Sequence, residues 1–391
     1  MKKITFILPT RNNLEFLKTA YKNLKKLSDG FHKILILDDG STDGTSEWLS
    51  SLQEPNLRIY TNYHSERLGI VGIFDKGIEL VDTQVIMMFH DDMVPSPNMD
   101  LNIIKHLKPK TVVSPTRVEP KLLDRGNEKI TKDFGNNASQ FDENDWILWS
   151  NTEESINENI TTEGVSTPWC MFKEDYLSIG GYDKLFAPQS KEDSDIFSRF
   201  VLNGYKLIQA WDALVYHFVS RNSRINDNSE LSIEANKQWL HDNNKNNKNF
   251  IRKWNSFIKH DQYMKPIITP KYDIGFKVSN PSLEAIAILE PLCNNIGVEN
   301  RHLYIDEYVR IEQEHTPFNL AHKIIEYNNV NNNVIVEFDI KRMSKQSFNV
   351  LLEIPQIIKE SGEIGEFELD VFRVIIKDMT TYENDLIIAN K

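Results

Sequence analysis

The sequence predicts an α/β protein with a mostly parallel sheet flanked by helices, followed by a small C-terminal α/β domain. Short apolar runs alternate with amphipathic helical patterns from residue 4 to residue 89, an order typical of parallel strands joined by helices. The chain has 391 residues. Because this exceeds what one hydrophobic core usually serves, we expect two domains, at about 1–265 and 266–391.

The first domain begins with the clearest pattern. In open parallel sheets, ligands bind where the strands end, next to the free N–H groups of helix N-termini. The residues directly after each strand are therefore the candidates for function. We predict strands at 4–8, 33–37, 57–60 and 85–89, with helices at 13–27, 43–52 and 70–81 between them.

The pattern loosens after residue 92. The polar stretch from 124 to 144 indicates an insertion or a mobile loop, and a helical tract at 230–259 is expected to close the first domain. The second domain matches no motif with a known role. Further strands are predicted at 111–116, 164–172, 333–340 and 368–377, and further helices at 282–292, 319–327 and 347–360.

Charge and cysteine content exclude several classes of protein. The chain carries 45 Lys and Arg against 57 Asp and Glu, a net charge of -12, which disfavours nucleic acid or an anionic membrane as a bulk partner. The two cysteines, Cys170 and Cys293, lie too far apart in sequence to suggest a disulfide framework, so we expect a reducing, cytoplasmic setting.

No apolar run is long enough for a signal sequence or a membrane span. Any association with the inner face of a membrane would then be peripheral, and a homo-oligomer is left open.

Acidic pairs follow two of the predicted strands. Asp38 and Asp39 come after the strand at 33–37, and Asp91 and Asp92 follow the strand at 85–89. Such residues cap helices and form turns. A carboxylate at this edge can also accept a hydrogen bond from ribose hydroxyls or a nucleobase N–H. Both interpretations stay open at this point.

A group of motifs resembles the family 2 glycosyltransferases with the Rossmann-like GT-A fold. The likeness covers about residues 1–260, and the order and spacing of the motifs are more specific than any one of them. This family transfers a sugar from a nucleotide donor, usually with inversion, using a divalent metal and one carboxylate base. The motifs are FILPTRNN, LDDGSTDGT, ERLGIVGIFDKGIEL, MMFHDDMVPSP, SIGGYDKLF and KEDSDIFSRF.

The resemblance implies a metal site after the strand at 85–89. The family usually has Asp-x-Asp where this chain has His90, Asp91 and Asp92, so we expect Asp92 first and Asp91 second as ligands of Mn²⁺ or Mg²⁺. His217 matches the position of a third ligand, and its imidazole favours manganese. The alternatives are a turn-capping pair and a core histidine.

The same resemblance places the catalytic base at Asp193, with Glu192 as an orienting or acceptor-binding neighbour. Asp195 is expected to be structural. The alternative is a capping box, because Ser190 and Asp193 have the Ser-x-x-Asp spacing at the start of a helical pattern.

The donor is expected to lie against the first strands, where Arg67 would reach the nucleobase or the phosphates and Gly69 would allow close backbone approach. An exposed surface arginine is the alternative for Arg67. Arg221 and Arg224 could fold over the pyrophosphate as a lid. The remaining donor-binding candidates are Pro9, Thr10 and Arg11, which would lie beside the nucleobase, Asp39 and Asp38, which would accept hydrogen bonds from it, and Asp91.

We therefore predict a metal-dependent, inverting glycosyltransferase with a nucleotide diphosphate donor, most simply a UDP-sugar. The acceptor would be a hydroxyl of a surface glycan, capsule or lipid-linked oligosaccharide. Two alternatives remain: a non-catalytic module that binds nucleotide sugars or glycans, favoured by His90 in place of an acid, and a transferase acting on protein or on modified phage DNA bases.

Overall fold

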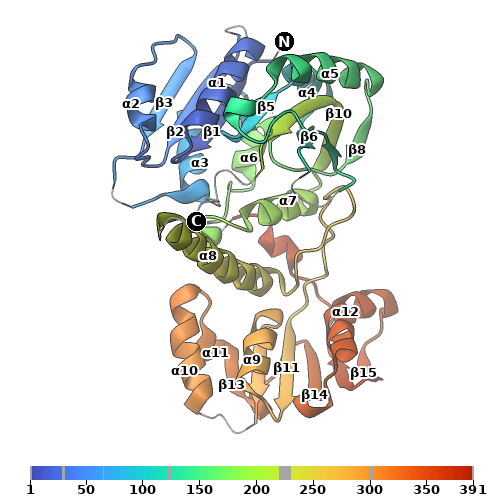
Figure 1. The fold of residues 1–391 in the computed structure, drawn as a ribbon. Coiled ribbons are helices and arrows are strands. Elements are labelled where there is room, and N and C mark those ends of the chain that lie inside the picture. The colour runs from blue at the N-terminus through green and yellow to red at the C-terminus, as the bar shows by residue number, and fades with distance from the viewer. Residues whose placement is uncertain are drawn as a thin grey trace. The chain divides into compact units, whose positions relative to one another are not determined.

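The computed structural model divides into two compact units, each built on its own sheet (Figure 1). Unit 1 comprises Met1–Asp242, His260–Pro266 and Ile388–Lys391, and unit 2 comprises Asn243–Lys259 and Ile267–Ile387. The predicted α/β class, with a large mostly parallel sheet and a smaller second sheet, is confirmed. The structure describes residues 2–28, 31–64, 66–121, 126–219, 230–299 and 303–389.

The sheet of unit 1 has the strand order β3-β2-β1-β4-β9-β6-β10-β5. Its parallel strands end at one common edge, which is the edge that carries ligands in sheets of this kind. The parallel strands are β1 (Ile4–Thr10), β2 (Lys33–Asp38), β3 (Leu57–Thr61), β4 (Val85–Met88), β6 (Thr111–Glu119) and β10 (Lys206–His217); β5 (Met93–Pro95), β8 (Thr161–Glu163) and β9 (Trp169–Phe172) run antiparallel to their neighbours, and β7 (Lys129–Thr131) pairs with β6 in parallel.

Helices bury both faces of this sheet. On one face, Phe6 of β1 shares a core with Leu17 of α1 (Leu14–Ser28) and Met99 of α4 (Met99–His106). On the other, α3 (Gly69–Leu80) packs so closely that a Cβ on Gly77 would lie 2.6 Å from Leu37 Cδ1. The sequence of a strand that is buried on both faces is an almost unbroken run of apolar residues. This burial explains why the first strands could be predicted from sequence.

The polar stretch predicted to be an insertion or loop is folded in the part that the structure describes, from residue 126 onward. It contains β7, a 3-10 helix at Ala138–Gln140 and the start of α5 (Glu143–Ile156). Widely spaced aromatic side chains hold it: Phe134 meets Trp146 and Tyr216 edge to face. These aromatic residues are few and widely spaced in a polar sequence, so they produce no helical or strand periodicity. The sequence pattern therefore did not reveal that this segment is folded.

Unit 2 has a six-stranded sheet in the order β13-β12-β11-β14-β16-β15. Its first four strands are parallel and the last two form an antiparallel hairpin. The elements are β11 (Ile274–Ser279), α9 (Leu283–Leu289), β12 (Asn295–Val298), α10 (Leu303–Glu312), α11 (Leu320–Lys323), β13 (Ile324–Glu326), β14 (Val334–Asp339), α12 (Lys345–Ser361), β15 (Gly365–Leu369) and β16 (Phe372–Ile376).

Two sequence predictions were wrong in unit 2. The helix predicted at 319–327 stops after the four residues of α11, and the chain continues as β13. The single strand predicted at 368–377 is a hairpin that turns at Asp370, whose φ is +54°. Because Asp takes this left-handed conformation more readily than most residues, the turn needs no glycine to mark it.

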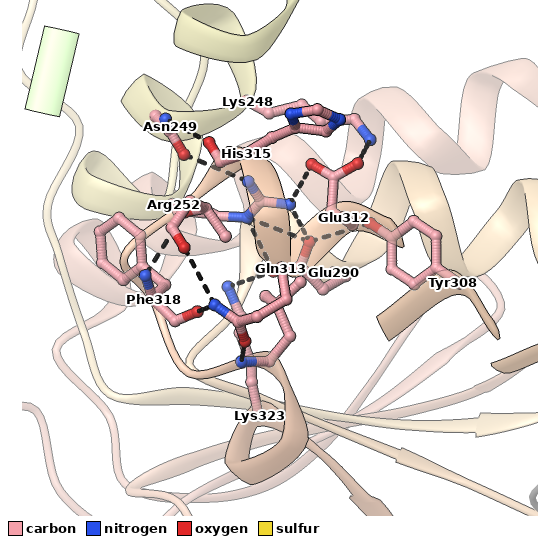
Figure 2. A network of polar contacts seen from close by, with 12 residues as sticks. Lys248, Asn249, Arg252, Glu290, Tyr308, Glu312, Gln313, His315, Phe318 and Lys323 are labelled. Atoms are coloured by element: carbon pink, nitrogen blue, oxygen red, sulfur yellow. Dashed lines mark hydrogen bonds and ion pairs between the residues drawn. The ribbon is translucent and has the colours of Figure 1, made fainter. Parts of the chain in front are cut away.

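The helix α8 (Glu230–Trp254) contributes to both units, since the division falls after Asp242. Within unit 2, its Arg252 is the centre of a buried polar network that Figure 2 shows. Arg252 Nη2 donates to Glu290 and Glu312, each at 2.7 Å. This network fastens the last turns of α8 to the segments around α9 and α10.

Candidate active site

Polar side chains from five strands of unit 1 gather at the edge where the parallel strands end. This follows from the register, because β1 pairs with β2 and β4, and β6 pairs with β10. The residues at or just beyond the strand ends are Thr10, Asp38, Asp39, His90, Asp91, Asp92, Glu119 and His217.

His90, Asp92 and His217 form a group that fits a metal ion. One ligand atom from each lies within 4.8 Å of the others. His217 Nε2 is 3.6 Å from Asp92 Oδ2, while Asp92 Oδ1 is buried and has no hydrogen-bond partner among the described residues. A buried carboxylate oxygen without a partner is costly, and a cation would satisfy it. Two imidazoles and a carboxylate are a suitable donor set.

Asp91, which the sequence placed second in the ligand set, lies outside this group. It is fully buried, and its Oδ2 and Oδ1 accept hydrogen bonds from Thr10 Oγ1 at 2.7 Å and Asn13 Nδ2 at 3.0 Å. The structure brings His90 to the group instead. A spacing of two residues at a strand end could have indicated this, because alternate side chains of an extended chain share a side.

His217 is held between two carboxylates. Its Nδ1 lies 2.8 Å from Glu119 Oε1, on the side away from Asp92. Burial acts to lower the pKa of His217, but Asp92 and Glu119 together raise it to about 9. Burial acts to raise the pKa of Glu119, but His217 and Arg117 bring it down to about 2. These acidic neighbours make the position strongly attractive to positive charge.

Asp193 lies in the first turn of α7 (Glu192–Leu202) and does not cap it. The alternative of a capping box at Ser190 does not hold, because Lys191 is the N-cap and its side chain makes no capping bond. Instead, Asp193 Oδ1 accepts from Tyr182 Oη at 2.9 Å and Oδ2 accepts from Thr167 Oγ1 at 3.1 Å. Two hydroxyl groups therefore fix the orientation of this carboxylate.

The chain that leads into α7 is strained. Ser190 and Lys191 have φ values of +81° and +74°, which cost side-chain-bearing residues about 1 kcal/mol or more and cluster at functional sites. Downstream, the buried Asp195 pairs with Arg199 at 2.8 Å, and Arg199 also donates to the Gly181 carbonyl. These contacts agree with the structural role expected for Asp195.

The carboxyl group of Glu192 has a different environment from that of its neighbour Asp193. Its Oε2 is shielded from solvent and has no hydrogen-bond partner in the described part of the chain. Burial, and then the charge of Asp193, raise the pKa of Glu192 to about 8. Two adjacent carboxyl groups whose environments differ in this way suit an acid and a base side by side.

The metal-binding group and Asp193 are close enough to interact electrostatically. Burial lowers the pKa of His90, whereas the charges of Asp92 and Asp193 both act to raise it. The carboxylates of Asp92 and Asp193 therefore both favour the charged form of His90.

On the donor side, Asp39 organises the start of α3. Asp39 Oδ1 accepts from Asn62 Nδ2 and the Leu68 N–H, at 2.9 and 3.0 Å, and Oδ2 accepts from the Gly69 N–H at 2.8 Å. Asp38 is fully buried and bonds to Ser41 N and Ser46 Oγ. Asp38 therefore holds its own loop, with one hydrogen bond to each of its carboxylate oxygens.

Arg67 lies beside Asp39, with its Nε 3.5 Å from Asp39 Oδ2 and its side chain 35% exposed. Its Nη2 also donates to Gln189 Oε1 at 3.1 Å. Partial burial lowers the pKa of Arg67, the neighbouring Arg11 lowers it further, and Asp39 raises it. The positive charge of Arg11 therefore acts on Arg67 at this edge.

Gly69 is required by its surroundings. Its φ is +67°, and a Cβ there would lie 2.2 Å from the Pro188 carbonyl oxygen. The start of α3 and the segment before α7 therefore touch backbone to backbone. Pro9 and Thr10 complete the end of β1, half-buried and buried. Arg221 and Arg224, predicted to form a lid, lie outside the described residues.

A comparison with known protein families finds a similarity over the N-terminal part of the chain. The profile described as glycosyl transferase family 2 matches residues 5–178. This match covers somewhat less than half of the chain, and over it the chain is similar to the family 2 glycosyltransferases. His90 and Asp92 fall within the matched range, while Asp193 and His217 follow it.

Curated proteins similar to part of this chain include the poly-beta-1,6-N-acetyl-D-glucosamine synthases of five Staphylococcus aureus strains. Each is 22% identical over 127 residues, which are 32% of this chain and 31% of the relative. The match therefore spans about a third of the length of these relatives.

Two solved structures are also similar. A crystal structure of GalNAc-T7 with UDP, GalNAc and Mn²⁺ covers 62% of this chain and 48% of its own, with 12% identity and a TM-score of 0.44. The mannosyltransferase PcManGT from Pyrobaculum calidifontis, in complex with GDP-Man and Mn²⁺, covers 56% and 58%, with 17% identity and a TM-score of 0.39. Among the described residues of the present chain, no helix is long and apolar enough to cross a membrane.

Proposed function

We propose that this protein is a metal-dependent, inverting glycosyltransferase that moves a sugar from a nucleotide diphosphate to a hydroxyl acceptor. One observation carries the proposal: His90, Asp92 and His217 lie close enough together to hold a metal ion, and Asp92 Oδ1 is buried with no hydrogen-bond partner among the described residues. Asp193 is oriented by two hydroxyls and takes no part in capping its helix. A pure binding module would need no such carboxylate.

Asp92, His217 and His90 would hold Mn²⁺ or Mg²⁺, and the two imidazoles favour Mn²⁺. A cation bound there acts as a Lewis acid on the departing diphosphate. If His90 belongs to the ligand set, the feature that favoured a non-catalytic module no longer does so, since the residue in place of the family's first acid would itself hold the metal.

Asp193 serves as the general base in this proposal. The acceptor O–H proton passes to Asp193 while the acceptor oxygen bonds to the sugar C1, and the bond from C1 to the phosphate oxygen breaks. Glu192, with its pKa raised to about 8, is protonated at neutral pH and can donate a hydrogen bond to the acceptor. Attack from the face opposite the leaving group inverts the anomeric carbon.

A UDP-sugar is the donor we propose, with Arg11 and Arg67 facing its phosphates or base. Asp39 already accepts three hydrogen bonds within the protein. Because a carboxylate accepts about four, roughly one position remains for a nucleobase N–H. The name of the Staphylococcus aureus relatives, synthases of an N-acetylglucosamine polymer, supports a glycan acceptor.

The experiment is a thermal-shift series with UDP, GDP and CMP, each with and without Mn²⁺, followed by an assay for sugar release from the matching sugar nucleotides. We expect one nucleoside diphosphate to raise the melting temperature only when Mn²⁺ is present. The variant Asp92→Asn should lose this metal-dependent shift. Nucleotide stabilisation that is the same without metal and in Asp92→Asn would contradict the proposal.

A further inference from the structure

Glu119 is a residue to which the sequence assigned no role, yet it lies directly behind the metal-binding group. It is the last residue of β6, and His217 is the last residue of β10. These strands run side by side in parallel, with Tyr216 opposite Val118. The register therefore brings the two strand ends together, and Glu119 is only 3% exposed.

The two nitrogens of His217 face different partners. Nδ1 lies 2.8 Å from Glu119 Oε1, whereas Nε2 faces Asp92 at 3.6 Å. An imidazole that donates its Nδ1–H to a carboxylate keeps a lone pair on Nε2, which is the atom a cation needs. Histidine ligands of metals commonly make such a hydrogen bond through their second nitrogen.

Glu119 is itself held in place. Its Oε2 accepts from Lys129 Nζ at 2.8 Å, and Arg117 Nη1 lies 3.5 Å from its Oε1. Lys129 comes from β7, which pairs with β6 opposite Arg117. Both carboxylate oxygens are therefore engaged, and neither can rotate away without losing a charged partner.

We propose that Glu119 is a positioning residue for the metal site: it fixes the ring and tautomer of His217 so that Nε2 points at the cation beside Asp92. This inference rests on the proposed metal-dependent function. The competing account is a purely structural ion group, in which His217 joins two carboxylates and Glu119 contributes only to stability.

The test is a Mn²⁺ titration, with free Mn²⁺ measured by electron paramagnetic resonance, on the full chain alone and with UDP present. We expect Glu119→Ala to bind Mn²⁺ about 10–100-fold more weakly than the wild type. Glu119→Gln keeps an oxygen that can accept the Nδ1–H, so its loss should be only a few-fold. If the alanine variant fails to fold, the glutamine variant still tests the proposal.

Glu128→Gln is the matched control. Glu128 Oε1 lies 3.6 Å from Arg117 Nη2, on the same network, and the substitution removes one negative charge without touching His217. We expect it to bind Mn²⁺ as the wild type does. Equal weakening in Glu128→Gln and Glu119→Ala would overturn the positioning role, because net charge would then explain both.

Further outcomes separate this inference from the proposed function. Wild-type affinity in Glu119→Ala or Glu119→Gln overturns the inference alone. A wild type that binds no Mn²⁺ under either condition overturns both. A wild type that binds Mn²⁺ and transfers no sugar from any nucleotide donor overturns the proposed function, while a weakened Glu119→Ala would still support the positioning role.

Discussion

The two units each contain a buried group of charged side chains. The groups differ in whether their carboxylate oxygens all have hydrogen-bond partners among the described residues. In unit 2, every carboxylate oxygen of Glu290 and Glu312 accepts a bond, from Arg252, Lys323, Tyr308 or Lys248 (Figure 2). In unit 1, Asp92 Oδ1 and Glu192 Oε2 are buried and have no partner among the described residues.

Each group contains a buried glutamate whose pKa is shifted, and the two shifts have opposite directions. Burial acts to raise the pKa of Glu290, but Lys323 and Arg252 bring it down to about 2. Burial raises the pKa of Glu192 as well, and Asp193 raises it further, to about 8. A network that satisfies all its charges stabilises a fold, whereas one that leaves acceptors open is ready for a ligand. The predictions below test this distinction.

The largest expected effect is on catalysis. Asp193→Asn keeps the shape of the side chain and one acceptor oxygen for Tyr182 or Thr167, but its amide nitrogen cannot accept from the other hydroxyl and it cannot take a proton. We expect sugar transfer to fall by about 10²–10⁴-fold, with Mn²⁺ and nucleotide affinity unchanged. Product formation and a parallel nucleotide titration measure the two quantities. Transfer at the parent rate would show that Asp193 is not the base.

The buried network around Arg252 in unit 2 should affect the stability of the fold rather than catalysis. Arg252→Met leaves the fully buried Glu290 with Lys323 as its remaining cationic partner, so we expect unit 2 to lose about 3–5 kcal/mol of unfolding free energy. Urea denaturation of the full chain measures this. Arg373→Met is the control, because Arg373 also pairs with two glutamates but is 44% exposed, and its loss should change little. An unchanged Arg252→Met would contradict the comparison.

Acid should weaken unit 2 through Glu290. Its pKa in the folded protein, about 2, lies below the ordinary value of 4.5. Its contribution is therefore complete above about pH 4.5 and is lost as the pH falls towards 2, by about 3 kcal/mol in all. The groups that face it are Arg252, Lys323, Tyr308, Glu312 and Cys293. The unfolding free energy of the wild type and of Glu290→Gln should be measured against pH, and the variant should lack this loss of stability in acid. The same pH dependence in both proteins would contradict the prediction.

The smallest effect is expected at Glu192. Because its pKa is raised to about 8, it is protonated below that pH and becomes a second negative charge beside Asp193 above it. We expect kcat/KM to decline above about pH 8 in the wild type by a few-fold. Glu192→Gln, which mimics the protonated form, should retain most activity at neutral pH and lose this alkaline decline. The same decline in Glu192→Gln would assign it to another group.

The sequence correctly placed Asp92 and His217 at the ends of strands, because the apolar runs of those strands were readable. Their role as metal ligands came from the family resemblance and stays a prediction. Glu119 was missed because its strand was predicted to end at Thr116, although β6 continues to Glu119. Lys129, which holds Glu119, lies in the polar stretch that was predicted to be a loop.

Other features depended on contacts that no local pattern reveals. The Ser-x-x-Asp spacing at Ser190 is chemically able to cap a helix, yet the chain turns through two left-handed residues there and Asp193 bonds to Tyr182 instead. In unit 2, a helical pattern became β13 because that segment pairs with β12 in the sheet. In both cases tertiary contacts outweigh local preference.

The most direct measurement is anomalous scattering at the manganese edge from crystals grown with Mn²⁺ and UDP. The account predicts a single strong peak bonded to Asp92, His217 and His90, with the nucleotide phosphates on its open side and Asp193 across the same group of side chains. A manganese peak held by Asp91, or one elsewhere in unit 1 while the nucleotide is bound, would contradict it.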